Sequence, residues 1–176
     1  SICNPTHNKL ISDLAVNTTN LGKADDKIIK NKRKTLGLLR DLKNAKTVGV
    51  IKEDKEKGIV EIAKPVGVVA AVTPSTNPAA TPINNILNAI KGRNSIVVSP
   101  SPSGLKVFQE LLSYIDQELN KIKAPKNLIQ TLPSPVSKDL TKELMKQVDL
   151  VIVTGSQSNV REAYSSGTPA IGVGQG

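Results

Sequence analysis

The sequence predicts an α/β protein built on an open, parallel, Rossmann-like sheet with helices on both faces. Short apolar runs rich in β-branched residues alternate along the chain with segments whose apolar residues recur at helical spacing. Prolines, glycines and small polar residues separate these two kinds of segment. Regular alternation of strands and helices implies parallel strands joined by right-handed crossovers, and this is the architecture that we expect.

The first complete unit of this alternation lies within residues 64–103. Val66–Val72 is an apolar run that is long enough for a buried strand and too short for a core helix. After the polar turn at 73–78 come the apolar residues of a helix that ends at Gly92, and Ser95–Val98 forms a second strand. This order places the turn at the carboxyl end of a parallel sheet, where open α/β folds bind ligands.

The same alternation continues toward the C-terminus. The helix that follows Gly104 shows the strongest apolar stripe in the sequence and ends at Ala124. Ser137 is a candidate cap for a later helix. Three further strands are expected, at Leu128–Leu132, Leu150–Val153 and Pro169–Val173.

The chain divides into three predicted parts. Residues 1–44 are expected to form two N-terminal helices that pack on the core, and residues 45–65 an extended hairpin around a charged connection. Residues 66–176 form the α/β domain. In the second helix the apolar residues tend toward one side, which indicates an amphipathic helix; they are Ile28, Ile29, Leu36, Leu39 and Leu42.

The composition predicts a soluble, cytoplasmic protein with an aliphatic core. The 176 residues include one Cys, one Phe, two Tyr and no Trp, so no internal disulfide forms. We find no signal peptide and no apolar stretch that reaches the roughly 18 residues needed to span a bilayer, so we expect no membrane partner. Cys3 and His7 have no third partner and Pro5 lies between them, so we assign neither a catalytic pair nor a metal site.

The net charge of +9 raises the alternative of a basic nucleic-acid-binding protein. The densest basic run, residues 27–34, has no aromatic residue nearby on which a base could stack. We therefore interpret the lysines as a solvated surface and expect no nucleic-acid partner. The same charge can steer anionic ligands such as dinucleotides or CoA toward the protein.

Three motifs in order resemble the CoA-acylating branch of the aldehyde dehydrogenase family, and the resemblance covers nearly the whole chain. They read KPVGVVAAVTPSTNP, KGRNSIVVSPSPSG and AYSSGTPAIGVGQG. The resemblance implies an aldehyde dehydrogenase-like fold. It also implies an enzyme that converts a short aldehyde, CoA and NAD or NADP into an acyl-CoA and NAD(P)H through a cysteine thioester.

Two further expectations follow from this resemblance. The hairpin at 45–65 corresponds to an oligomerisation element, so a homo-oligomer is expected. Family members continue beyond the position of Gly176 into the segment that carries the cysteine nucleophile. We therefore expect residues 66–176 to be a dinucleotide-binding domain that is incomplete at its C-terminus, and the chain to be inactive alone. The alternative is a truncated, non-catalytic module for nucleotide binding or assembly.

The resemblance places the first loop beside the nicotinamide. Asn77 is the candidate donor to the oxyanion of the reacting aldehyde, and one preorganised donor is worth about 2.7–4 kcal/mol. Hydrolytic relatives have their asparagine at the position of Thr76, and Asn77 could instead only close a turn before Pro78. The implied cofactor contacts in this loop are Thr73, Pro74, Ser75 and Thr76.

The second loop lies where the adenosine ribose would bind. It has no acidic residue to bind a 2′-hydroxyl, and Lys106 is close in sequence, which favours NADP. The prolines could equally make this segment a rigid connector. The candidate cofactor contacts are Ser99, Pro100, Ser101 and Pro102.

The third loop lies between a strand and a helix N-terminus. Unpaired backbone N–H groups and the helix dipole suit a phosphate there, and the resemblance implies contacts to the cofactor pyrophosphate. The candidate contacts are Thr154, Gly155 and Ser156.

The last segment bears on the type of reaction. Hydrolytic family members have a glutamate base at about the position of Gly172, and a glycine cannot activate water. The absence of this glutamate leaves room for a thiol, so the resemblance implies acyl transfer to CoA. The AYSSGTPAIGVG motif favours this acylating branch over a relative that reduces an acyl phosphate. Gly172, Val173 and Gly174 are candidate cofactor contacts, and the glycines could equally serve only to let the strand pass close to the cofactor.

Overall fold

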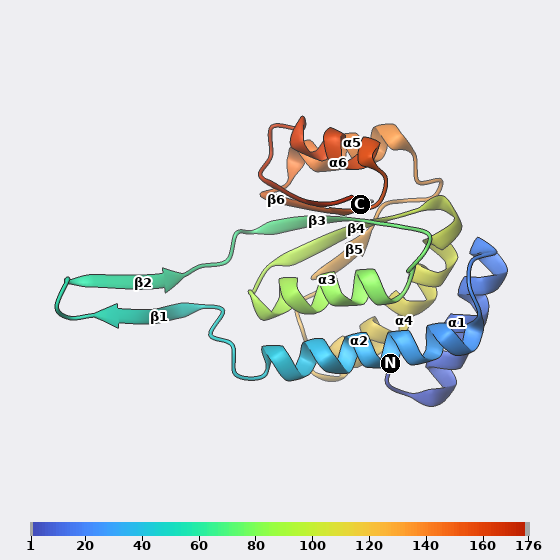
Figure 1. Ribbon diagram of the computed structural model, residues 1–176, viewed down its shortest axis with the longest axis horizontal. Helices are drawn as coiled ribbons and strands as arrows, with labels where there is room; N and C mark the ends of the chain where they lie inside the picture. Colours follow the sequence, from blue (N-terminus) through green and yellow to red (C-terminus); the bar gives the residue numbers. More distant parts are fainter. Residues whose placement is uncertain (1, 175–176) are drawn as a thin grey trace.

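A five-stranded parallel sheet forms the centre of the computed structural model, which describes residues 2–174 (Figure 1). The sheet order is β5-β4-β3-β6-β7, so the chain moves outward from β3 on one side and then returns to the other side of β3. This reversal creates a switch point between β3 and its neighbours, the place where open sheets bind ligands. The strands are β3 (Val68–Thr73), β4 (Ser95–Pro100), β5 (Ile129–Thr131), β6 (Leu150–Thr154) and β7 (Ala170–Val173).

Helices cover both faces of the sheet, which confirms the predicted fold class (Figure 1). Side chains alternate along β3: Val69 and Ala71 pack in one core and Ala70 and Val72 in the other. The first core includes residues of α1 (Pro5–Thr19), α3 (Ala80–Lys91) and α4 (Leu105–Lys121), which follows a short 3₁₀-helix at Pro102–Gly104. The second includes residues of α5 (Lys138–Gln147) and α6 (Gln157–Tyr164).

The second N-terminal helix, α2 (Ala24–Leu42), packs on α1 and α3 rather than on the sheet. Three of its five predicted apolar residues are exposed, with Ile29, Leu36 and Leu39 at 55%, 44% and 41%, whereas Ile28 and Leu42 are half-buried. The buried positions are the polar residues Asn31 and Thr35. The amphipathic pattern therefore identifies the packed face only in part, because the fully buried positions of this helix are polar.

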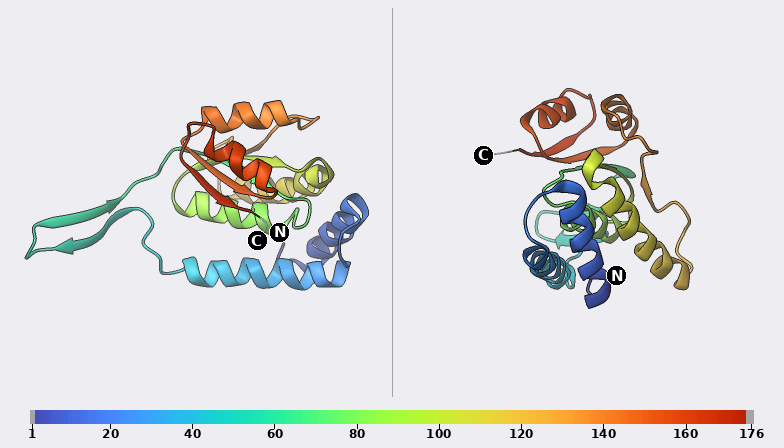
Figure 2. Two further views of the ribbon diagram at one scale, coloured as in Figure 1. Left: turned by 45° about the horizontal axis from the view of Figure 1, so that its top comes forward. Right: turned by 90° about the vertical axis from the view of Figure 1, so that its right-hand side faces the viewer.

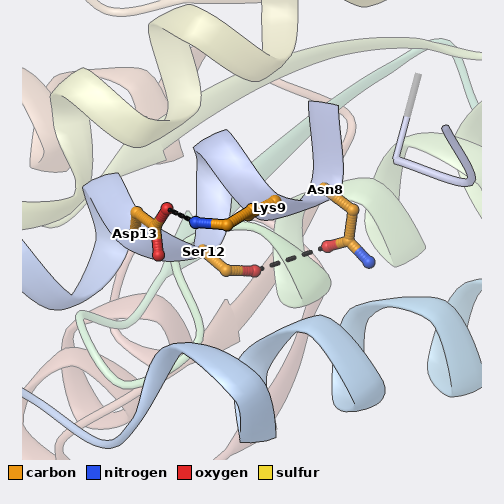
Figure 3. A network of polar contacts seen from close by, with 4 residues as sticks. All are labelled: Asn8, Lys9, Ser12 and Asp13. Carbon is orange, nitrogen blue, oxygen red and sulfur yellow. Dashed lines mark hydrogen bonds and ion pairs between the residues drawn. The ribbon is translucent and has the colours of Figure 1, made fainter. Parts of the chain in front are cut away.

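Polar contacts form a buried network between α1 and α2. Asn31 donates from Nδ2 to Asn8 Oδ1 at 3.1 Å and to Ser12 Oγ at 3.2 Å, and Ser12 Oγ donates to Asn8 Oδ1 at 3.4 Å. Asn8 Nδ2 donates to the backbone oxygen of Ile28 at 2.9 Å. Figure 3 shows Asn8 and Ser12 joined in this way, beside the exposed ion pair of Lys9 and Asp13. Each partner satisfies another, so burial of these polar groups is not a net cost.

The predicted hairpin is present and extends away from the rest of the molecule (Figure 2). It consists of β1 (Gly49–Asp54) and β2 (Ile59–Ala63), which pair in antiparallel fashion with a register irregularity between Val50 and Lys52. Five large apolar side chains on it are exposed, namely Val50, Ile51, Ile59, Val60 and Ile62. Within residues 2–174, no helix has both the length and the apolar character that crossing a bilayer needs.

Candidate cofactor-binding cleft

A cleft of about 690 Å³ lies at the carboxyl ends of β3, β4, β6 and β7. Its volume is in the range of small-molecule sites, about 300–1,000 Å³. The three predicted loops meet in it, at 73–77, 99–102 and 154–156, together with Val173 and Gly174. Every predicted site residue except Gly172 lines the cleft. The structure therefore brings together, from three distant parts of the sequence, the residues that the sequence analysis selected.

The first loop begins with a buried hydroxyl that lacks a partner. Thr73 is 3% exposed, and within residues 2–174 its Oγ1 has no hydrogen-bond partner. The backbone oxygen of Thr73 accepts the N–H of Ser101 at 3.1 Å, which ties the first loop to the second. A buried hydroxyl without a partner is costly unless a ligand or water satisfies it, so Thr73 fits a bound polar ligand.

The end of the first loop is held by two lysines of α2. Lys30 Nζ donates to Asn77 Oδ1 at 3.1 Å, and Lys27 Nζ donates to the backbone oxygen of Thr76 at 3.2 Å. Burial, and then the nearby charge of Lys30, lower the pKa of Lys27. The following helix α3 receives no side-chain cap, since its N-cap residue is Ala79. The side chain of Asn77 thus contacts α2 and does not cap α3.

The second loop makes hydrogen bonds at both of its serines. Ser99 is buried and its Oγ lies 2.8 Å from Thr141 Oγ1 of α5. Ser101 Oγ accepts the N–H of Gly104 at 3.2 Å and caps the 3₁₀-helix. The hydroxyls of these two serines are therefore already engaged. Lys106, which the sequence analysis considered, is not among the residues that line the cleft.

The third loop presents the N-terminus of α6 to the cleft. Ser156 is the N-cap residue, and its Oγ accepts the N–H of Asn159 at 3.4 Å. The N–H of Gly155 donates to Val173 O at 3.1 Å, which joins the end of β6 to β7. The first turn of a helix carries unpaired N–H groups and a positive dipole end, so this edge of the cleft suits a phosphate.

Gly172 is the one predicted site residue that lies elsewhere. A Cβ at this position would lie 2.7 Å from Val160 Cγ1 and 3.0 Å from the Tyr164 hydroxyl oxygen. The space beside Gly172 is therefore filled by α6 and not by the cleft. The role that we predicted for it, leaving room for a thiol, stays a prediction.

Sequence reasoning missed the wall that α5 and α6 contribute. Lys138 and Lys142 of α5 line the cleft, and Lys142 Nζ pairs with Glu162 Oε2 of α6 at 3.2 Å. Neither helix has a motif, and only the tertiary packing brings their outer turns beside the strand ends. The other residues of this wall are Ser137, Thr141, Met145, Ser158 and Asn159.

The Cys3 and His7 pair takes no part in the cleft. Cys3 is exposed, and the ring of His7 stacks on Tyr114 with a centroid distance of 4.0 Å. The structure therefore places both residues outside the cleft.

Comparisons with known proteins agree with the resemblance. The sulfoacetaldehyde dehydrogenase (acylating) of Cupriavidus necator is 58% identical over 176 residues, which is 100% of this chain and 36% of that protein. An acetylating aldehyde dehydrogenase from Geobacillus thermoglucosidasius has a crystal structure that matches with a TM-score of 0.91 at 40% identity, over 99% of this chain and 39% of that one.

An engineered glycolyl-CoA reductase with bound NADP⁺ matches with a TM-score of 0.81 at 30% identity, over 99% of this chain and 40% of that one. The chain thus spans less than half the length of each of these proteins. The model of the aldehyde dehydrogenase family matches residues 14–171. This chain therefore belongs to the aldehyde dehydrogenase family.

Proposed function

We propose that the cleft binds NAD or NADP in an enzyme that oxidises a short aldehyde to an acyl-CoA. The observation that carries the proposal is the meeting of three loops and the N-terminus of α6 around one cleft at the switch point of the sheet. The buried hydroxyl of Thr73, which lacks a partner within residues 2–174, fits a polar ligand at the same place. The relatives described above act on an aldehyde or on an acyl-CoA, and one structure holds NADP⁺.

The overall reaction balances as aldehyde, CoA and NAD(P)⁺ giving acyl-CoA, NAD(P)H and one proton. The bound nicotinamide supplies the acceptor for the hydride. Residues of this chain would hold the cofactor: the N-terminus of α6 at Ser156 would bind the pyrophosphate, and the loops at 73–76 and 99–102 would bind the two nucleosides. Asn77 donates to the aldehyde oxygen as negative charge develops on it. The nucleophilic cysteine that the resemblance implies is not Cys3, which is exposed and does not line the cleft.

NADP is the favoured cofactor in this proposal. The loop at 99–102 carries no acidic residue, so nothing in it repels a 2′-phosphate. Lys138 and Lys142 add positive charge to the cleft wall, and of these Lys142 is paired with Glu162. A lysine at this wall attracts the additional phosphate of NADP.

We further propose that two or more copies assemble through the hairpin. Its five exposed apolar side chains lie on a two-stranded sheet that has no other strand beside it within residues 2–174. Such an edge is stabilised when another chain covers it.

The test is a titration of NADP and NAD against the protein and against the variant Ser156→Asp. Aspartate caps a helix as well as serine does, so the fold persists, but its carboxylate repels a pyrophosphate at the N-terminus of α6. We expect at least a tenfold rise in Kd, as measured by calorimetry, which corresponds to about 1.4 kcal/mol. The matched control is Asn4→Asp, which changes the cap of α1 in the same way and lies outside the cleft.

Several results would contradict the proposal. Equal Kd values for wild type, Ser156→Asp and Asn4→Asp would contradict the proposal that the N-terminus of α6 binds the pyrophosphate. A larger rise in melting temperature with NADP than with NAD supports the cofactor preference, since a ligand stabilises the state that it binds. Cofactor binding without CoA-dependent aldehyde oxidation, measured on the whole protein that the gene encodes, would favour the alternative of a non-catalytic binding module.

A further inference from the structure

Two ammonium groups of α2 reach the loop that carries Asn77. Lys27 and Lys30 are three positions apart in the helix, so they project from the same face. Their Nζ atoms donate to two consecutive residues, Thr76 through its backbone oxygen at 3.2 Å and Asn77 through its side-chain oxygen at 3.1 Å. Neither the resemblance nor the local sequence indicates a role for α2 at the cleft.

The contact from Lys30 determines how the amide of Asn77 is oriented. An ammonium group only donates hydrogen bonds, so it binds the oxygen of an amide and never the nitrogen. With Oδ1 held toward α2, Nδ2 lies on the other side of the amide carbon, and one of its two N–H bonds points away from the carbonyl oxygen. Asn77 itself lines the cleft in which the proposed oxyanion would form.

The helix that carries these lysines is itself fixed in place. Asn31 follows Lys30 directly and is 4% exposed, within the buried network that joins α2 to Asn8 and Ser12 of α1. The position of Lys30 along the axis of α2 is therefore set by the buried contacts of Asn31 and not by the loop that Lys30 contacts. A rigid support of this kind is what a precisely placed catalytic donor requires.

We propose that Lys30 is a positioning residue for Asn77, holding Oδ1 so that Nδ2 points to the reacting aldehyde oxygen. The positive charge on the carbonyl side also polarises the amide and strengthens its N–H donors. This inference rests on the proposed function, because it gives Asn77 its role in the reaction. It adds a residue on α2 that touches neither the substrate nor the cofactor and acts only through Asn77.

A merely structural role for Lys30 predicts something different. Lys30 is exposed, and exposed polar contacts contribute little to stability, about 0–1 kcal/mol. Loss of the contact should thus leave the melting temperature nearly unchanged while changing kcat. A structural role would instead lower the melting temperature and leave kcat nearly unchanged.

The experiment uses steady-state kinetics of the whole protein that the gene encodes, with the variants Lys30→Met, Asn77→Ala and their combination. We expect Lys30→Met to lower kcat by about tenfold or more with KM within about threefold, since the lost interaction acts on the transition state. The double variant should be no slower than Asn77→Ala alone, because Lys30 acts only through Asn77. Lys30→Arg should recover part of the rate. Lys32→Met, an exposed lysine two positions away on the other side of α2, is the control.

Each failure has its own meaning. Equal kinetics for Lys30→Met and Lys32→Met, or effects of Lys30→Met and Asn77→Ala that multiply, would overturn the positioning role while wild-type activity still supports the proposed function. Wild-type protein without CoA-dependent aldehyde oxidation would overturn the proposed function. That result would overturn the role of Lys30 as well, because Asn77 would then have no reacting aldehyde oxygen to bind.

Discussion

The hydroxyl oxygen of Tyr164 lies 3.2 Å from the backbone nitrogen of Gly172 and accepts its hydrogen bond. Tyr164 comes from the last turn of α6, and Gly172 from the middle of the edge strand β7. The aromatic ring occupies the place that a side chain at 172 would take. The glycine is therefore required by the packing of α6 on β7, whatever role it also has in the reaction.

We predict that Gly172→Ala destabilises the fold. Its Cβ would lie 2.7 Å from Val160 Cγ1, so α6 must shift, and such overpacking costs about 1–3 kcal/mol. Chemical denaturation measures this loss. The matched control is Gly37→Ala in α2, where no atom lies within 4 Å of the added methyl group; it should raise stability by about 0.5–1 kcal/mol. Equal effects of the two substitutions would contradict the packing argument.

A second glycine, Gly67, is required directly before strand β3. Gly67 has a φ of +122°, and a Cβ there would collide with the carboxylate of Asp149. That carboxylate accepts the N–H of Val68 at 2.7 Å and so joins the starts of β3 and β6. We predict that Gly67→Ala lowers the free energy of unfolding by about 1–3 kcal/mol, from backbone strain and the collision together.

The test of this prediction has an internal comparison. Asp149→Ala removes the acceptor of one hydrogen bond and should cost about 1 kcal/mol. In the Asp149→Ala background, Gly67→Ala should cost less than in the wild type, because the collision is gone while the backbone strain remains. Strictly additive losses in thermal or chemical unfolding would argue against the contact.

The two lysines beside Asn77 give a prediction on pH. Burial and then the charge of Lys30 lower the pKa of Lys27 from 10.5, so the folded protein gives up this proton more readily than the unfolded chain. The unfolded state binds more protons between the two pKa values, and stability therefore rises with pH across that window. We predict that Lys30→Met raises the pKa of Lys27, as followed by NMR titration of its side-chain carbon. Lys32→Met should leave the pKa of Lys27 unchanged. If Lys30→Met also leaves it unchanged, the charge of Lys30 is not a cause of the lowered pKa.

The hairpin gives a prediction on assembly. Replacement of Val60 and Ile62, two exposed apolar residues on one face of β2, by lysine should shift the protein to smaller species. Light scattering coupled to size exclusion measures the mass. Glu61→Lys, which lies between them on the opposite face and is already charged, should keep the wild-type mass. If both proteins have the same mass, the hairpin does not carry the assembly.

The sheet and the three loops of the cleft could be predicted because their signals are local. Apolar runs such as that ending at Val72 identify strands, and parallel pairing then gathers the following loops at one edge. Local patterns do not carry the remaining features. The apolar residues of α2 suggested its packed side, yet its fully buried positions are Asn31 and Thr35, and Asn31 bonds to residues of α1 that are far away in the sequence.

The cleft wall from α5 and α6 shows the same limit. Lys138 and Lys142 are ordinary charged residues of a polar helix, and only the packing of that helix beside the strand ends makes them part of the cleft. Lys30 is a further example, since its contact with Asn77 spans 47 positions of sequence. Contacts of this kind depend on the relative placement of whole elements, which no spacing rule encodes.

The buried trio of Asn8, Ser12 and Asn31 has a consequence for how this protein can evolve. An apolar replacement at one of the three leaves its partners buried without hydrogen bonds, at about 1–3 kcal/mol, whereas replacement of all three by apolar groups of matching shape avoids that loss. Proteins with only one or two of the three replacements are therefore less stable than either end point. Across descendants, these three positions should be inherited as one joint character and exchanged together, rather than drifting independently.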